Sequence, residues 1–286
     1  MDHTDCDRSK STELKNIHLD VDAVCLAIYM VGGSPMQFFF IRFSAGIACF
    51  IFFAASAVAI ADSGFENNSL IALDLGKSLR ERTVAIYHLG DSGDERAVES
   101  LLNILAGKTE PEGLRSNAAR ALADLGKARS RVISTFETVY RERDAGNNLR
   151  YTILLCLGWM RATKSLPLMT KAMSDPNPMI RFKACQALGQ LGGEASVQLL
   201  GSHLNNEKDT IVRAETVRAL GHTKSMAAEK DLIHSLLSDP EPIVRWNAAL
   251  MLKELPSLSP NARSALNAAL NDSSPMVCET VKGMLK

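Results

Sequence analysis

An arginine that recurs at nearly constant spacing is the feature that most constrains the fold of this chain. The steps between successive copies are 33, 35, 31, 32, 32 and 33 residues. A period of this size, held over seven copies, is typical of proteins that stack one helical or mixed unit many times. The six arginines are Arg82, Arg115, Arg150, Arg181, Arg213 and Arg245, and Cys278 stands in the seventh place.

Each arginine lies in a segment whose apolar residues have helical spacing. Counted from Arg181, apolar residues fall at −1, +3, +4, +7 and +10, which is one buried stripe of an amphipathic helix. Pro178 and Pro242 stand three residues before their arginines, where the first turn of a helix tolerates proline. Asp175 and Asp239 precede that turn and are expected to cap its free N–H groups. A helix is therefore predicted to begin just before each arginine.

A second helix is predicted after each arginine-led helix. Apolar residues again recur at intervals of three and four, for example over residues 195–204, 228–237 and 262–270. Glycines such as Gly189 and Gly221 are expected to end the first helix of a unit. One such pair cannot bury its apolar face alone, whereas a stack of pairs can. The fold class expected for residues 62–286 is therefore all-α, an α-solenoid of about six to seven stacked helical hairpins.

The pattern Asp-Pro-x-Pro-x-Val-Arg-x-x-Ala-x-x-Ala-Leu-Gly resembles a HEAT repeat. The short loops and Ala-Leu-Gly endings are most similar to the compact HEAT-like repeats of the phycobilisome (PBS) lyase type. The resemblance covers roughly residues 70–286 and is best in the copies of Arg181, Arg213 and Arg245, while those of Arg82 and Arg150 depart from it. It implies an α-solenoid that binds other macromolecules, with the arginine-led helices along its concave face. In the PBS lyase family, such repeats help to attach bilin chromophores.

The chain before residue 62 does not follow the repeat. Residues 1–35 match no copy, and we interpret them as an extension produced by a misplaced start site, with translation beginning at Met36. From there, Arg42 is followed by an apolar run that closes on Ala57, Ala59 and Ala61, which predicts a signal peptide over residues 36–61. An uncleaved membrane anchor is the alternative. Both place the repeats outside the cytoplasm, periplasmic, secreted or membrane-anchored, with membrane contact only through this segment.

The recurring arginines are expected to be structural. Each guanidinium can tie its own loop or the next one through charge-assisted hydrogen bonds to nearby acids. The thiols of Cys156 and Cys185 are interpreted as packed core groups, although a disulfide between them remains open. The histidines show no metal-ligand spacing, so the sequence predicts no metal, no cofactor and no catalytic residue. A formal net charge of zero, with no basic stripe, disfavours nucleic acid.

Binding specificity is expected from positions that vary between copies on the concave face. These are +2, +5 and +9 from each arginine, with +1 at the edge. Trp159 and Trp246 either anchor a partner or fill gaps between repeats, and both readings stay open. The residues predicted to bind the partner are Arg120, Tyr151, Leu155, Trp159, Lys183, Gln186, Gln190, Arg218, Trp246, Asn247 and Leu250.

From the sequence, the function expected is that of an exported, non-catalytic scaffold or adaptor. Its partner would be a protein or peptide bound on the concave face, and the chain would not be an enzyme. Two alternatives remain: a lyase-like enzyme subunit related to the bilin lyases, and a structural component of an envelope assembly. Because one fold hosts many functions, the repeat pattern does not decide between them.

Overall fold

The computed structural model describes residues 64–285 of the 286-residue chain. The chain divides into two units, Met1–Asp62 and Ser63–Lys286, and the described residues belong to the second. The extension over residues 1–35 and the signal segment expected over 36–61 lie outside the described residues. Within the described part, none of the helices combines the length and the apolar character needed to cross a membrane.

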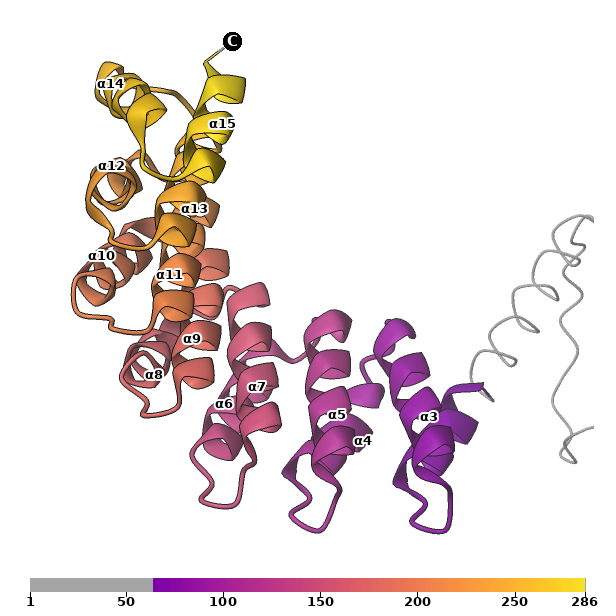
Figure 1. Cartoon of the computed structure of the whole chain (residues 1–286). Coiled ribbons are helices and arrows are strands. Elements are labelled where there is room, and N and C mark those ends of the chain that lie inside the picture. Colours follow the sequence, from indigo (N-terminus) through magenta and orange to yellow (C-terminus); the bar gives the residue numbers. More distant parts are fainter. Residues whose placement is uncertain (1–63, 286) are drawn as a thin grey trace, which may run out of the picture. The chain divides into compact units, whose positions relative to one another are not determined.

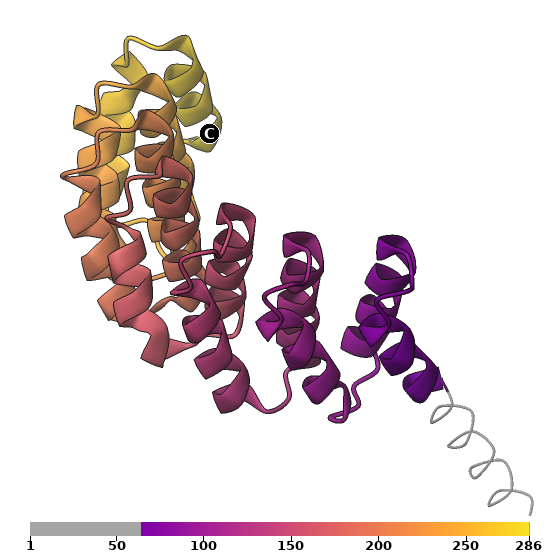
Figure 2. The ribbon, with the colours of Figure 1, turned by 90° about the horizontal axis from the view of Figure 1, so that it is seen from below.

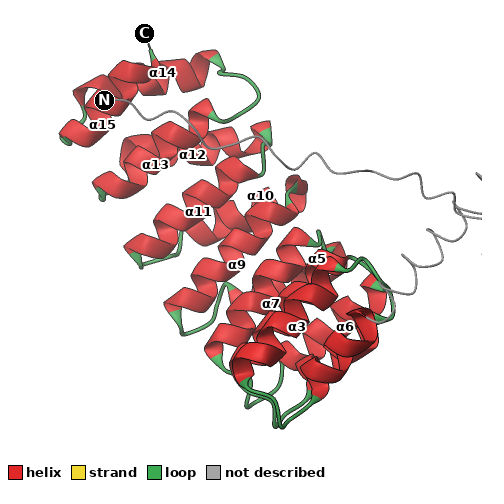
Figure 3. Ribbon diagram, turned by 90° about the vertical axis from the view of Figure 1, so that its right-hand side faces the viewer, coloured by secondary structure: helices red, strands yellow, loops and turns green. Residues whose placement is uncertain are grey.

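Residues 64–285 form helices, turns and loops without a strand (Figure 3), which confirms the all-α prediction. A helix over residues 64–73 precedes the regular pattern. The helices that carry the repeat position are α3 (Leu79–Asp91), α5 (Glu112–Leu125), α7 (Asn147–Trp159), α9 (Pro178–Leu191), α11 (Thr210–His222), α13 (Pro242–Lys253) and α15 (Pro275–Met284). Their partners are α4 (Ala97–Ala106), α6 (Arg129–Tyr140), α8 (Leu166–Ala172), α10 (Gly193–Leu204), α12 (Glu229–Ser238) and α14 (Pro260–Ala268). Short 3₁₀ helices cover Thr163–Ser165, Met226–Ala228 and Ala269–Asn271.

The described helices form two layers. The odd-numbered helices pack against one another in order. The even-numbered helices α4, α6, α8, α10 and α12 each pack against the odd-numbered helix that follows, and α14 packs against α12. Figure 1 shows that the stack bends. The odd-numbered helices α7, α9, α11, α13 and α15 lie on the inner side of the bend, and α8, α10, α12 and α14 lie on the outer side. Figure 2 shows the same stack from below. The surface formed by the odd-numbered helices is called the inner face below. This arrangement is the α-solenoid that the repeat predicts.

Proline and short polar side chains set the starts of the inner helices. Pro178 and Pro242 occupy the first helical position of α9 and α13, as expected. The caps differ from the expectation, because the carboxylates of Asp175 and Asp239 accept from the N–H two residues later, within the lead-in turn. The side chain of Asn177 caps α9 instead, and α13 has no side-chain cap. The lead-in acids therefore shape the turn before the helix.

Glycine allows adjacent inner helices to approach closely. A Cβ added at Gly158 would lie 2.8 Å from Ala187 Cα, and one at Gly189 would lie 2.9 Å from Ala219 Cα. Both distances are below the closest contact that real Cβ atoms make. Because both glycines stand eight residues after their repeat arginines, the spacing of the inner layer depends on a residue type set by the repeat.

The core is a continuous band of Leu, Ile, Val and Ala side chains between the two layers. Cys156 and Cys185 belong to it, and both are buried free thiols, which confirms the interpretation as packed groups. Burial raises the pKa of each thiol to about 12, so both stay protonated and unreactive at neutral pH.

Candidate functional site on the inner face

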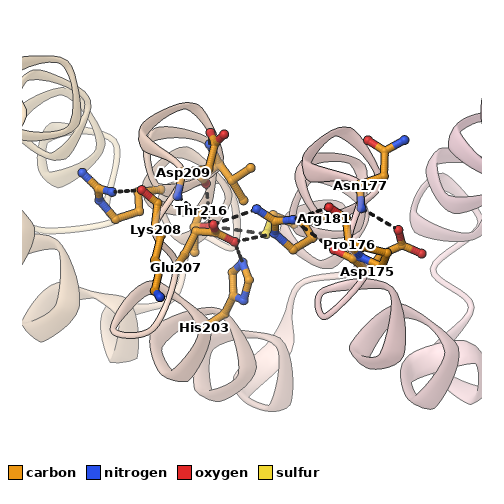
Figure 4. Close-up of polar contacts among 12 residues, drawn as sticks. Asp175, Pro176, Asn177, Arg181, His203, Glu207, Lys208, Asp209 and Thr216 are labelled. Carbon is orange, nitrogen blue, oxygen red and sulfur yellow. Dashed lines mark hydrogen bonds and ion pairs between the residues drawn. The ribbon is translucent and has the colours of Figure 1, made fainter.

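The repeat arginines set the register from which the inner face is read. In Figure 4, Arg181 lies between its own lead-in turn and the next one. Its Nε and Nη2 donate to the two carboxylate oxygens of Glu207 at 2.7 and 2.9 Å, and its Nη1 donates to the carbonyl of Asp175 at 3.0 Å. One side chain thus joins two successive repeats by charge-assisted bonds.

The same tie recurs in the following copies. Arg213 donates through two nitrogens to the Asp239 carboxylate, and Arg245 does so to the carboxylate of Asp272. In the last copy Cys278 keeps half of the tie, because its thiol donates to the Asp272 carbonyl at 2.9 Å. Since these side chains are hydrogen-bonded to neighbouring loops, a ligand on the inner face would contact side chains at other positions of each helix.

Four of the predicted site residues line one hollow of the inner face. Arg120 of α5, Tyr151 and Leu155 of α7 and Lys183 of α9 border a cavity of about 390 Å³. The register therefore brings together side chains that lie up to 63 residues apart in the sequence. At the edge of this cavity, the carboxylate of Glu112 accepts from the Leu149 N–H at 2.9 Å and is already occupied.

Next to this hollow lies a cluster of charged groups on α9 and α11. Lys183 Nζ donates to Gln186 Oε1 at 3.0 Å. On α11, Arg218 Nη1 donates to Glu215 Oε2 at 3.2 Å. The side chain of Arg218 is 47% exposed and that of Glu215 only 3%, so the arginine covers the acid. The inner face from α5 to α11 thus carries Arg120 and Lys183 at the hollow, and Lys183 and Arg218 near one buried carboxyl group.

The buried carboxyl has an altered protonation equilibrium. Burial raises the pKa of Glu215, and the charge of Arg218, the Gln186 amide and the charge of Lys183 oppose that rise without cancelling it. A carboxyl with a raised pKa can hold a proton closer to neutral pH than a solvated glutamate does. Such a group, beside exposed cations on a concave surface, suits the binding of an acidic molecule and the transfer of a proton.

The remaining predicted residues lie along the same layer but do not join this cluster. Trp159 at the end of α7 is 51% exposed, and Gln190 is half-buried. Trp246 Nε1 donates to Thr280 Oγ1 at 2.9 Å, which joins α13 to α15. Asn247 is buried and donates to the carbonyl of Ile243, while Leu250 packs against the core. The C-terminal part of the row is therefore largely occupied with packing.

Glu215 was not among the inner-face residues that the sequence predicted to bind the partner. Its position, +2 from Arg213, belongs to the variable row. The signal that could have identified it is the pattern Glu215-x-x-Arg218, because residues three apart on a helix are neighbours and can pair. Its burial depends on the neighbouring helix α9, which the pattern does not reveal.

Comparisons with known families agree with this architecture. Residues 133–221 and 202–281 match a family model described as HEAT repeats, so the matches span more than half of the chain. Residues 81–107 match the model of the PBS lyase HEAT-like repeat. Proteins with HEAT repeats commonly bind other proteins.

The curated proteins that the chain resembles include enzymes. It is 29% identical over 187 residues to a deoxyhypusine hydroxylase of Candida glabrata, which covers 60% of this chain and 58% of that protein. It is 33% identical over 111 residues to the bilin biosynthesis protein RpcF of a Synechococcus strain, covering 39% of this chain and 52% of that protein. The chain thus spans less than two thirds of either relative.

Among solved structures, the Escherichia coli protein YibA has a TM-score of 0.51 at 15% identity. The likeness covers 79% of this chain and 82% of that one. At this level of identity the likeness concerns the fold alone.

Two expectations from the sequence are wrong on these findings. The chain was expected to be a non-catalytic scaffold, but its relatives are deoxyhypusine hydroxylases and a bilin biosynthesis protein, which point to an enzyme. The expected location outside the cytoplasm is also contradicted by these relatives. The repeat pattern was right about architecture, but fold carries no function with it.

Proposed function

The chain belongs to the HEAT-repeat family, and from this premise we propose that it is a subunit of a lyase-like enzyme related to the bilin lyases. Its substrate would lie on the inner face between α5 and α11. The likeness to RpcF and the match to the PBS lyase repeat support this choice of enzyme class. As a subunit, the chain would share the reaction with a protein partner.

The observation that carries this proposal is a set of three cations along the inner face, of which Arg120 and Lys183 line the hollow and Lys183 and Arg218 lie near the buried Glu215. A bilin is an open-chain tetrapyrrole with an extended apolar body and carboxylate side chains. The three cations offer charge-assisted bonds to such carboxylates, and Tyr151 and Leu155 offer apolar surface beside them. Glu215 is the buried carboxyl beside Arg218, and its raised pKa lets it keep a proton at a higher pH than a solvated glutamate does.

The hydroxylase relatives suggest a different chemistry. Enzymes that use oxygen generally do so with a metal or an organic cofactor. Across residues 64–285, no group of three or more His, Cys, Asp or Glu side chains is placed to hold a metal ion. The described side chains do not fit such a centre, and we therefore derive no hydroxylation step.

Binding of a free bilin, followed by its absorbance, tests the proposal. We expect wild-type protein to bind it, and the double variant Lys183→Ala, Arg218→Ala to bind at least about tenfold more weakly, because two charge-assisted contacts are lost. The matched control is Lys230→Ala, Arg263→Ala, which removes one lysine and one arginine from the exposed surface of the outer helices α12 and α14. Equal loss in both double variants would contradict the proposal.

The role of Glu215 has its own readout. In the wild type, the absorbance of bound bilin should change with pH above the usual range of a glutamate, because the pKa of this carboxyl is raised. The variant Glu215→Gln should bind with similar affinity and lack that change. An unchanged pH profile would exclude Glu215 as the proton-carrying group while leaving the binding result intact.

A further inference from the structure

The copy of the repeat that begins at Arg150 departs from the tie described above. Its Nη2 donates to the carbonyl of Glu142 at 2.9 Å, but its Nε is buried without a hydrogen-bond partner. Among the described residues, it is the repeat arginine that has no carboxylate partner. The other five arginines, in order, pair with Glu110, Glu142, Glu207, Asp239 and Asp272.

Register identifies the acid that would complete the tie. Glu207, Asp239 and Asp272 each stand six residues before the next repeat position, and Asp175 stands six residues before Arg181. Yet no ion pair joins Arg150 to Asp175 within the described part of the chain. The carboxylate of Asp175 accepts from the Asn177 N–H at 2.9 Å. A buried guanidinium nitrogen with no partner is uncommon, because such a group loses its hydration without compensation.

A cavity of about 650 Å³ lies at this position. Besides Arg150 and Asp175, Arg141 at the end of α6 and Lys171 of α8 line it, so three cations face one carboxylate. Arg141 is partly compensated by Glu137, whose carboxylate accepts from it at 3.3 Å. Lys171 is exposed. The cavity therefore carries an excess of positive charge beside an unsatisfied arginine.

The walls of this cavity also include apolar surface. Tyr140, Pro167 and Leu168 line it, and the Arg150 guanidinium lies 5.9 Å from the centroid of the Tyr140 ring. Burial, followed by the charge of Asp175, raises the pKa of Tyr140 to about 12, so the phenol stays neutral and can donate a hydrogen bond. The volume lies within the range of about 300–1,000 Å³ that is usual for small-molecule sites.

The equivalent place beside Arg213 shows what an ordinary copy looks like. The cavity there has a volume of about 310 Å³, and the Asp239 carboxylate accepts a hydrogen bond from the Arg213 guanidinium. Leu204 and Asn205 stand where the larger cavity has Tyr140 and Arg141. Both the missing ion pair and the added cations therefore belong to the Arg150 copy.

We propose that this space, the Arg150 cavity, binds a small organic anion. It is defined by Tyr140, Arg141, Arg150, Leu168, Lys171 and Asp175. A carboxylate or phosphate group of the ligand takes the place that an aspartate or glutamate side chain takes in the other copies. The body of the ligand contacts Tyr140, Pro167 and Leu168. This site is separate from the inner-face cluster and does not rest on the proposed function.

Isothermal titration of the full chain with benzoate and with phenyl phosphate tests this proposal, and benzyl alcohol serves as the uncharged probe. We expect at least one anion to bind and benzyl alcohol not to bind. Binding of benzoate alone identifies a carboxylate site, and binding of phenyl phosphate alone a phosphate site. Binding of benzyl alcohol as tight as that of the anions would overturn the proposal, because it would need no cation.

Variants locate the bound anion. Lys171→Ala and Arg150→Met should each weaken binding at least about tenfold, because each removes a charge-assisted contact. Asp175→Asn should strengthen it several-fold, because the carboxylate that lines the cavity is neutralised while its amide oxygen can still accept from Asn177. The control Lys230→Ala should bind as the wild type does. Failure of both anions to bind the wild type would overturn the proposal. So would binding to Lys171→Ala and Arg150→Met that is as tight as binding to the wild type.

Discussion

The copies that begin at Arg181, Arg213 and Arg245 differ from the copy that begins at Arg150. In the first three, a guanidinium grips the carboxylate of the next lead-in turn with two hydrogen bonds. At Arg150 the acid is present in the sequence, but the tie is not made. The outer helix that precedes this turn, α8, has 7 residues against 12 in α10 and 10 in α12. The turn that carries Asp175 thus follows a shorter outer helix than the turns that carry Glu207 and Asp239.

The comparison teaches that one residue type can serve two purposes in a repeat protein. Where the carboxylate of the next loop reaches the arginine, the guanidinium is hydrogen-bonded within the fold. Where it does not, the same guanidinium is left for a ligand. A departure from the repeat pattern is therefore a place to look for a site, because the other repeat arginines keep their carboxylate partners.

The largest effect is expected when the tie itself is removed. Arg213→Ala leaves the carboxylate of Asp239 buried without its partner, and we expect the free energy of unfolding to fall by about 3 kcal/mol. Arg150→Ala loses one hydrogen bond to a carbonyl, and about 1 kcal/mol is expected. Urea unfolding followed by circular dichroism compares the two, and equal losses would mean that Arg150 is tied as firmly as Arg213.

Glycine substitutions test whether the difference extends beyond the polar ties. Gly158→Ala and Gly189→Ala each push a Cβ against the backbone of the next inner helix, at 2.8 and 2.9 Å. Overpacking of this kind costs about 1–3 kcal/mol, and we expect similar losses at both positions in the same unfolding experiment. A much smaller loss at Gly158 would show that the Arg150 copy is loosely packed throughout.

Arg218→Ala tests an inner-face arginine that takes no part in the ties between successive repeats. Its side chain is about half exposed, and among the described residues its ion pair is with the neighbouring Glu215, so its removal should lower stability less than removal of Arg213 does. Melting temperatures measured beside Arg213→Ala check this. If both variants melted at the same temperature, the assignment of register would be wrong.

The smallest effect is a dependence on pH. Hydrogen bonds from Arg245 hold the pKa of Asp272 below its usual range. Its stabilising contribution is therefore complete above the usual aspartate pKa of about 3.9 and is lost as the pH falls through the lower folded value. The difference in melting temperature between wild type and Arg245→Ala should shrink on acidification, whereas the difference for Arg150→Ala should stay constant. A constant difference for Arg245→Ala would contradict the tie.

Much of the fold follows from the sequence, and much of the site does not. Arginine spacing and helical periodicity were sufficient for the stack, its two layers and the row that holds Arg120, Tyr151 and Lys183. The burial of Glu215 depends on contact between α9 and α11, which a single-helix pattern does not contain. The failure of Asp175 to reach Arg150 depends on loop geometry, although the residue stands in the expected place. The repeat periodicity did not indicate that some relatives of this chain are enzymes.

A pair of double-mutant cycles tests the broken tie most directly. The first combines Arg150→Ala with Asp175→Ala, and the second combines Arg213→Ala with Asp239→Ala, with stability measured by urea unfolding. We expect a coupling energy of at least about 1.5 kcal/mol between Arg213 and Asp239, and close to zero between Arg150 and Asp175. Equal coupling in both cycles would mean that Arg150 pairs as the others do and would leave no unpaired arginine for an anion.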